Sequence, residues 1–183
     1  MKSLGFLNSY ELDEVAANVT IRKISKGDCL IKAGEVCKEI IFLESGLLRS
    51  YYINLNGDDM TYCVTFENEF ISAYASYVSG APAIENIEAM VDSTVSVLRK
   101  EFVEEKASTS LPFSKLMRYY AESYIVEIET RLLSYQSEDA SDRYRLFLEK
   151  YPHYLNQISR QQLASYLGIS VRHLSRISKE FQK

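Results

Sequence analysis

The pattern of apolar and polar positions predicts that a strand-rich part is followed by a helical part. From about residue 19 to residue 98, short apolar runs are separated by turn sequences that contain glycine, and Asn56-Gly57 is the strongest hairpin signal. One run alternates from residue to residue, with Met60, Tyr62, Val64 and Phe66 set against Thr61, Cys63 and Thr65. A period of two is typical of a half-buried strand, and turns spaced by roughly 7 to 12 residues are typical of an antiparallel barrel or jelly roll. We therefore expect an antiparallel β-roll, preceded by a short helix over residues 8–18 that Asn8 and Glu11 cap as a pair.

A long helix is predicted from residue 111, with Ser110 as its cap and Pro112 in its first turn. A seam of the coiled-coil kind recurs along it at spacings of 4, 3, 4 and 3, through Ala121, Ile125, Ile128, Leu132 and Tyr135. A second apolar stripe lies beside the seam and contains Phe113, Met117, Tyr120 and Tyr124. One stripe can cover the roll while the seam meets a second copy, so we expect Ala121, Ile125, Ile128 and Leu132 at a dimer interface. The alternative is a helix that buries both stripes within one chain.

The C-terminal part is expected to hold a polar hinge at residues 137–141, a helix over about 141–150, and then two short helices joined by a tight turn. Ser159 and Gln162 have the spacing of a capping box, which marks the start of the first short helix. Gly168 then supplies the left-handed backbone that a turn of three to four residues needs. This arrangement is typical of a helix-turn-helix.

The second short helix has the side chains that a DNA-recognition helix needs. Ser170 is its predicted cap, while Leu174 and Ile177 are expected to face inward. Arginines four residues apart share one helix face, so Arg172 and Arg176 can enter one major groove and read base edges. The full set of candidate DNA contacts, in which Lys179 and Arg160 are assigned to phosphates, is Arg160, Ser170, Arg172, His173, Ser175, Arg176 and Lys179. The alternative is a structural helical hairpin with solvated charges.

The distribution of charge supports a DNA-binding C-terminus even though the net charge of the chain is −4. Residues 1–140 carry 13 basic and 22 acidic side chains, whereas residues 141–183 carry 8 basic and 3 acidic ones. A local basic face is enough to neutralise phosphates. The sequence thus predicts an acidic sensory part followed by a basic DNA-binding part.

Other functional classes find little support in the sequence. An enzyme needs a convergent set of catalytic groups, and the only two histidines are His153, which follows a proline, and His173, on the presumed recognition helix. The three cysteines lack metal-ligand spacing, so free thiols are expected and neither a metal nor another cofactor. No signal peptide or membrane span is apparent, which predicts a cytoplasmic protein. We therefore expect a protein that is not an enzyme.

The order of these elements resembles the Crp/Fnr family of bacterial transcription regulators over nearly the whole chain. The most specific segments are residues 141–152, residues 163–170 and Leu174-Ser-Arg-Ile177, which look most like Crp-like regulators of Bacteroidetes-type bacteria. The resemblance implies an α+β chain with a jelly-roll-like effector domain over residues 1–110, a dimerisation helix over 111–137 and a helix-turn-helix domain over 138–183. It also implies a homodimer on a two-fold symmetric DNA site, with RNA polymerase as a possible further partner.

Two departures from the family pattern concern the effector and the DNA backbone. Members that bind cyclic AMP have a Gly-Glu pair and, about ten residues later, Arg-Ser; the matching positions here are Ser72-Ala73 and Asn86-Ile87, and no lysine or arginine occurs from Leu55 to Leu98. A buried cyclic phosphate would lack a cation, so we expect no cyclic-nucleotide binding. The β-hairpin wing that usually follows the recognition helix is short or absent, which should weaken phosphate contacts.

The many tyrosines leave two interpretations of the effector domain open. They can line a pocket for an unknown small-molecule effector, with Phe70, Tyr74, Tyr77, Asn86, Tyr120 and Tyr124 as candidate lining. They can equally be core and interface filler. A rival function for the whole chain is a β-roll module that senses a ligand or docks a partner protein, with C-terminal helices that serve assembly rather than DNA binding.

Overall fold

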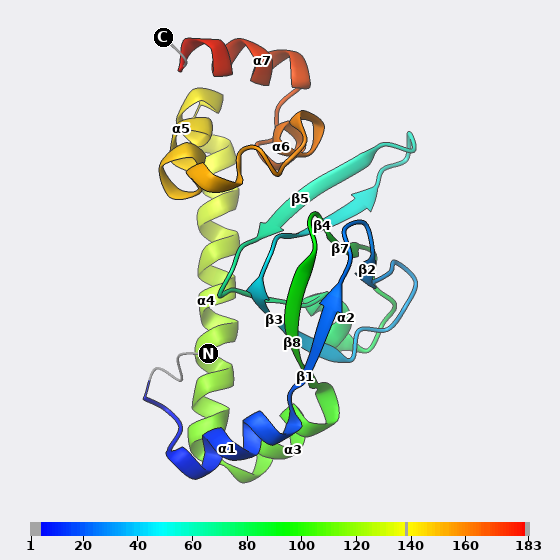
Figure 1. Cartoon of the computed structure of the whole chain (residues 1–183), viewed down its shortest axis with the longest axis vertical. Coiled ribbons are helices and arrows are strands. Elements are labelled where there is room, and N and C mark those ends of the chain that lie inside the picture. The colour runs from blue at the N-terminus through cyan, green and yellow to red at the C-terminus, as the bar shows by residue number, and fades with distance from the viewer. Residues whose placement is uncertain (1–4, 138, 182–183) are drawn as a thin grey trace.

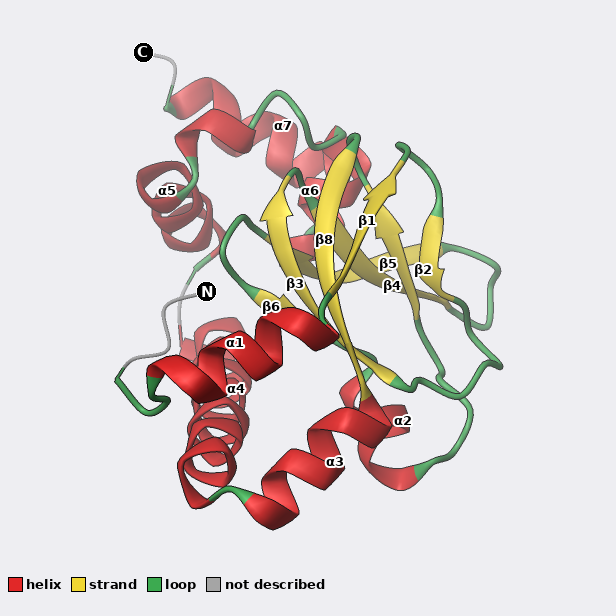
Figure 2. Ribbon diagram, turned by 60° about the horizontal axis from the view of Figure 1, so that its bottom comes forward, coloured by secondary structure: helices red, strands yellow, loops and turns green. Residues whose placement is uncertain are grey.

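The computed structural model describes residues 5–137 and 139–181, and its β-roll has the predicted antiparallel architecture. Two four-stranded sheets face each other, with the strand orders β1-β8-β3-β6 and β2-β7-β4-β5 (Figures 1 and 2). The strands are β1 (Thr20–Ile24), β2 (Cys29–Ile31), β3 (Glu39–Ser45), β4 (Leu48–Ile53), β5 (Asp59–Thr65), β6 (Phe70–Ile71), β7 (Asn86–Ala89) and β8 (Ser93–Arg99). The predicted α+β fold class is therefore confirmed.

The interior of the roll is filled by alternate residues of its strands. Ile41 and Leu43 of β3 pair with Val97 and Val95 of β8, and all four side chains are buried. Ile87 of β7 belongs to the same apolar cluster. Since complete burial of such a side chain stabilises a fold by roughly 1.5–3 kcal/mol, this cluster holds the two sheets together.

The alternation predicted for β5 is wrong in its first half. The register of the β4–β5 hairpin shifts between Ser50 and Tyr51, which pair with Cys63 and Thr61 and leave Tyr62 as the extra residue. Such a bulge exchanges the two faces of a strand. Thr61 is accordingly buried and Tyr62 is 38% exposed, whereas Val64 is buried as predicted.

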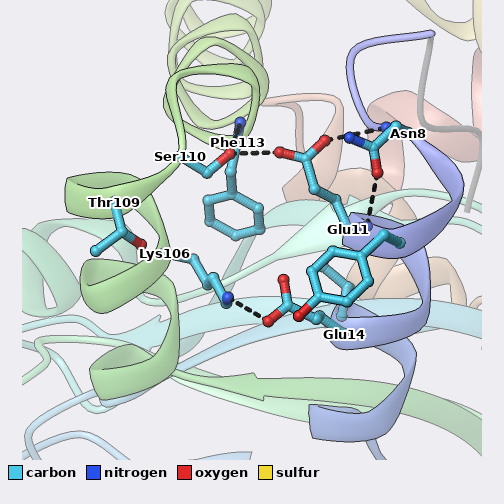
Figure 3. Close-up of a pocket in the computed structure, with 9 residues that line it drawn as sticks. Asn8, Glu11, Glu14, Lys106, Thr109, Ser110 and Phe113 are labelled. Atoms are coloured by element: carbon cyan, nitrogen blue, oxygen red, sulfur yellow. Dashed lines mark hydrogen bonds and ion pairs between the residues drawn. The ribbon is translucent and has the colours of Figure 1, made fainter.

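The helices α1 (Ser9–Asn18), α3 (Lys100–Thr109) and α4 (Leu111–Ser137) meet beneath the roll (Figure 2). The predicted Asn8–Glu11 capping box is present at the start of α1. Glu11 also accepts a hydrogen bond from the Ser110 hydroxyl at 2.6 Å, and Glu14 forms a 2.6 Å ion pair with Lys106 across a hollow of about 370 Å³ (Figure 3). These contacts hold α1 against the end of α3 and the start of α4.

The C-terminal helices pack directly on the outside of the roll. They are α5 (Ala140–Lys150), the 3-10 turn Pro152–Tyr154, α6 (Arg160–Tyr166) and α7 (Val171–Glu180). Val64 of β5 and the following Phe66 share one apolar cluster with Phe147 of α5 and Leu163 of α6. The Phe66 ring stacks on Tyr151 with 3.4 Å between the centroids. The roll and the C-terminal helices therefore share a core.

Two further findings concern the whole described part of the chain. Among residues 5–137 and 139–181, no helix combines the length and the apolar character that crossing a membrane would require. Within the same ranges, no group of three or more His, Cys, Asp or Glu side chains has the arrangement of a metal site.

Candidate nucleic-acid interface

The two short C-terminal helices begin where their capping residues predict. The Ser159 hydroxyl accepts a hydrogen bond from the Gln162 backbone N–H, and the Gln162 side chain accepts one from the Ser159 N–H, which completes the capping box. Ser170 accepts from the N–H of His173 at the start of α7. Gly168 has a φ of 69° in the turn between them, a value that glycine adopts without strain. The local chemistry of the helix-turn-helix is thus confirmed.

The outer face of α7 presents cations whose side chains have no partner among the described residues. The side chains of Arg172, Arg176 and Lys179 are exposed, and no side-chain hydrogen bond or ion pair joins any of them to another residue in the described part of the chain. Glu180, four residues after Arg176, does not pair with it there. Leu174 and Ile177 on the opposite face are buried. The helix therefore offers its positive charge to solvent and can meet an anion without first breaking an ion pair.

The remaining candidate DNA contacts are placed around this face. His173 and Ser175 are half-buried beside the exposed arginines, and the capping Ser170 is exposed. Arg160 is exposed in the first turn of α6 and interacts electrostatically with Tyr144 of α5. The structure thus brings the set together at one end of the molecule, around α6 and α7 (Figure 1).

The two stripes of α4 differ in exposure. In the seam, Ile125, Ile128 and Leu132 are 61%, 48% and 57% exposed, and Ala121 is half-buried. The other stripe packs on the molecule itself, because Phe113 is buried and Tyr120 lies 4.5 Å from the Phe70 ring. The single chain consequently leaves an uncovered apolar seam along its longest helix.

Five of the six candidate effector residues contact one another through their rings, and Tyr120 and Tyr124 are the ones that lie on α4. The rings of Tyr74 and Tyr124 are 5.3 Å apart, and Tyr74 also stacks on Tyr77 of helix α2 (Tyr74–Ser79). Burial raises the pKa of Tyr124 to about 12, with smaller contributions from Cys63 and Glu85. The Asn86 side chain accepts a hydrogen bond from the Ala33 N–H and so holds a neighbouring loop. None of the six candidate residues lines the hollow of about 370 Å³ or a second one of about 320 Å³.

A carboxylate, not a cation, is buried beside these tyrosines. Glu85 is only 8% exposed, and its Oε2 has no hydrogen-bond partner among the described residues. Burial raises the pKa of this side chain to about 7. Lys100, at the start of α3, donates to the Tyr77 carbonyl and lies 3.6 Å from Glu104. This environment disfavours a phosphate.

Sequence reasoning missed the residues that tie the helix-turn-helix to the long helix. The Tyr135 hydroxyl donates to the Tyr166 carbonyl at 2.6 Å, and Arg131 donates to the same carbonyl at 3.2 Å. Arg143 donates to the Leu167 carbonyl at 3.0 Å. The one available signal was an arginine between two seam positions, which does not identify a partner 35 residues further along the chain.

Comparison with known proteins places the chain among regulators. Residues 21–110 match the model of the cyclic nucleotide-binding domain. The fumarate and nitrate reduction regulatory protein of Yersinia pestis is 24% identical over 97% of this chain and 75% of its own length. Among solved structures, FixK2 from Bradyrhizobium japonicum covers 90% of this chain and 84% of its own with a TM-score of 0.78 at 18% identity. A protein from Eubacterium rectale assigned to the Crp/Fnr family of transcriptional regulators covers 100% of this chain and 87% of its own, with a TM-score of 0.74 at 17% identity.

Proposed function

Since the chain belongs to the Crp/Fnr family of transcription regulators, we propose that it binds a specific, two-fold symmetric DNA site as a homodimer. The observation that carries this proposal is the outer face of α7, where Arg172, Arg176 and Lys179 are exposed without protein partners in the described chain. Because these side chains form no ion pair within the described chain, none has to be broken when they contact a phosphate or a base edge, and their attraction to the DNA is not reduced by that cost.

The side chains of α7 divide into base readers and phosphate contacts. Arg172 and Arg176, one turn apart, extend into the major groove, where a bidentate contact to guanine discriminates by about 1–3 kcal/mol. Ser170, His173 and Ser175 at the start and side of the helix add shorter contacts. Lys179 and Arg160 meet the backbone, which contributes affinity but no sequence choice.

The long helix α4 forms the dimer interface in this proposal, because a two-fold symmetric DNA site requires two copies of the chain. Its exposed seam of Ala121, Ile125, Ile128 and Leu132 packs against the same seam of a partner chain, an isologous contact about a two-fold axis. In this proposal residues 1–110 form the effector domain, residues 111–137 the dimerisation helix, and residues 138–183 the DNA-binding domain.

The effector domain does not use a cyclic nucleotide in this proposal. The buried Glu85 and the absence of basic residues from Leu55 to Leu98 leave a cyclic phosphate without a cation. Isothermal titration calorimetry with cyclic AMP and cyclic GMP is therefore expected to show no saturable heat. A site tighter than about 100 μM, which corresponds to roughly −5.5 kcal/mol, contradicts this part of the proposal.

The salt dependence of DNA binding tests the proposal against its rival. A binding-site selection first yields the preferred sequence, and its affinity is then measured between about 50 and 200 mM salt. A DNA-binding regulator loses affinity log-linearly with salt, because counterions are released from the phosphates. A ligand-sensing or docking module whose C-terminal helices serve assembly enriches no sequence and shows no such slope.

A further inference from the structure

The end of α6 is held by side chains from the two preceding helices. The last carbonyls of any helix lack partners inside it and need donors from elsewhere. In α6, the Ala164 carbonyl accepts from the Ile169 N–H and the Ser165 carbonyl from the Gly168 N–H, as the turn itself provides. The next carbonyl, that of Tyr166, accepts hydrogen bonds from side chains of the long helix α4.

Three side chains supply those donors. Tyr135 and Arg131 of α4 both donate to the Tyr166 carbonyl, and Arg143 of α5 donates to the Leu167 carbonyl. Arg131 also donates to the Tyr135 hydroxyl at 3.0 Å, so the two α4 side chains form one network. Cations at a helix C-terminus are favoured by its dipole, which strengthens these bonds.

The network is fitted closely to the turn of the helix-turn-helix. A Cβ atom added to Gly168 would lie 3.0 Å from the Tyr135 ring, so only glycine fits beneath that ring without displacing it. The Arg131 guanidinium lies 4.3 Å from the centre of the Tyr166 ring and forms no ion pair with a carboxylate in the described chain. Besides the Tyr166 carbonyl, it contacts the Tyr135 hydroxyl on its own helix and the Cys63 thiol of β5.

The same stretch of α4 carries the exposed seam. Arg131 stands between the seam residues Ile128 and Leu132, and Tyr135, the last residue of the predicted seam, donates its hydroxyl to the turn of its own chain. The seam proposed to meet a second copy and the side chains that donate to the turn are therefore separated by less than one helical turn. If these hydrogen bonds keep α4 and the turn in one arrangement, the orientation of α7 relative to the two-fold axis of the dimer is fixed as well.

We propose that Arg131, Tyr135 and Arg143 are positioning residues that fix the angle between α4 and α7, and thereby set the half-site spacing that the dimer accepts. This inference rests on the proposed function, because spacing has meaning only for a DNA-binding dimer. Two recognition helices about one turn of DNA apart, roughly 34–36 Å, must enter successive grooves together, so a loosened joint tolerates other spacings.

The first test varies the DNA. Affinity is measured for a single half-site and for full sites whose spacers are lengthened or shortened by one and two base pairs. Tyr135→Phe and Arg131→Met are compared with Tyr119→Phe, a tyrosine on the same helix whose hydroxyl makes no described hydrogen bond. In Tyr135→Phe and Arg131→Met, the preference for the best spacer over the others is expected to fall by at least roughly threefold to tenfold, the range for a single hydrogen bond, since each variant loses more than one, while half-site affinity is unchanged.

Two results overturn the inference. One is a wild-type spacer preference in folded Tyr135→Phe and Arg131→Met proteins. The other is an equal loss of affinity on half-sites and full sites, which indicates a role in stability alone. Tyr119→Phe is expected to match the wild type in both measurements.

A second test needs no DNA and so separates the failure of this inference from failure of the proposed function. Spin labels are placed at Glu122 of α4 and Glu180 of α7 through unnatural amino acids, which leaves the native cysteines unmodified, and labelled chains are diluted with unlabelled ones. The distance distribution between the labels is expected to broaden in Tyr135→Phe and in Arg131→Met. An unchanged distance distribution refutes the proposal that these residues fix the angle between α4 and α7, even if DNA binding is confirmed. A broadened distribution supports that positioning role even if no DNA site is found.

Discussion

The arginine side chain that is buried in the roll is paired with carboxylates, whereas those on the described outer face of α7 are exposed and unpaired. In the roll, Arg49 is only 5% exposed and is held by Asp59 at 2.6 Å and by Glu88 at 3.1 Å. On α7, Arg172 and Arg176 are exposed and hold no carboxylate among the described residues. A buried ion pair that loses one partner leaves an uncompensated charge, whereas an exposed cation can exchange water for phosphate at little cost.

This difference reconciles an acidic chain with the proposed binding to DNA. In the roll, Arg49 and the half-buried Arg22 are paired with carboxylates, Arg22 with Glu39 at 2.5 Å. The Oε2 atom of the buried Glu85 has no hydrogen-bond partner among the described residues. Net charge sums both regions and therefore hides the basic face. The location of each charge and its pairing decide which partner the surface attracts.

The largest effect is expected where the two regions are joined. Phe66 is 3% exposed and stacks on Tyr151, so Phe66→Ala leaves a cavity between the roll and the C-terminal helices and is expected to lower the free energy of unfolding by about 3–5 kcal/mol. Urea denaturation followed by circular dichroism measures the change. Tyr10→Ala, at a 71% exposed position, is the control and should stay within about 0.5 kcal/mol. A loss below about 1 kcal/mol in Phe66→Ala means that the regions are independent.

The second largest effect is expected on dimerisation, from a substitution in the exposed seam of α4. Ile128→Glu places a charge where a partner seam is proposed and removes a side chain worth roughly 1.5–3 kcal/mol from each copy. We expect a monomer at micromolar concentration in sedimentation velocity. Ile21→Glu, at a 69% exposed position on β1, is expected to remain dimeric. A dimeric Ile128→Glu protein shows that α4 is not the interface.

A smaller effect is expected from each cation of α7 separately. Arg172→Ala and Arg176→Ala should each flatten the preference at particular base positions by about 1–3 kcal/mol. Lys179→Ala should weaken all sequences alike and reduce the salt slope by about one. Binding-site selection followed by titration measures both, with Lys23→Ala on the roll as the control. An unchanged consensus in both arginine variants contradicts base reading by this helix.

The smallest effect comes from the unpartnered acid of the roll. Burial raises the pKa of Glu85 from 4.5 to about 7, so the unfolded chain ionises first and stability is lost as pH rises from about 4.5 to 7. Glu85→Gln removes this loss, and we expect it to be more stable than the wild type by roughly 1–2 kcal/mol at pH 8, after allowance for solvent screening, but equally stable at pH 4. Thermal denaturation across this range, with Asp13→Asn as control, measures it. Parallel pH profiles for wild type and Glu85→Gln contradict the assignment.

Local chemistry made the helices predictable. Asn8 with Glu11 and Ser159 with Gln162 satisfy backbone groups only a few residues away, so their spacing in the sequence is already the contact. The same holds for Gly168, whose left-handed backbone ends one helix before the next begins. Site residues on these elements could therefore be named from the sequence.

Non-local packing was not predictable in the same way. The bulge at Tyr62 depends on how β5 meets β4, and it exchanged the faces of half a strand. Glu85 adjoins Asn86, and nothing in their order indicates that one is buried without a partner while the other holds a loop. The grip of Tyr135 on the Tyr166 carbonyl joins residues 31 positions apart, beyond the reach of any helical or strand period.

The core shared by the roll and the C-terminal helices has a consequence for how the chain is made. Leu47, Val64 and Phe66 are synthesised long before Leu174 and Ile177, the last two buried residues of their cluster along the chain. At about 5–20 residues per second, the interval is roughly 5 to 20 seconds, much longer than a hairpin or a helix needs to form. The roll thus exposes the apolar surface formed by these side chains until the last helices have been synthesised.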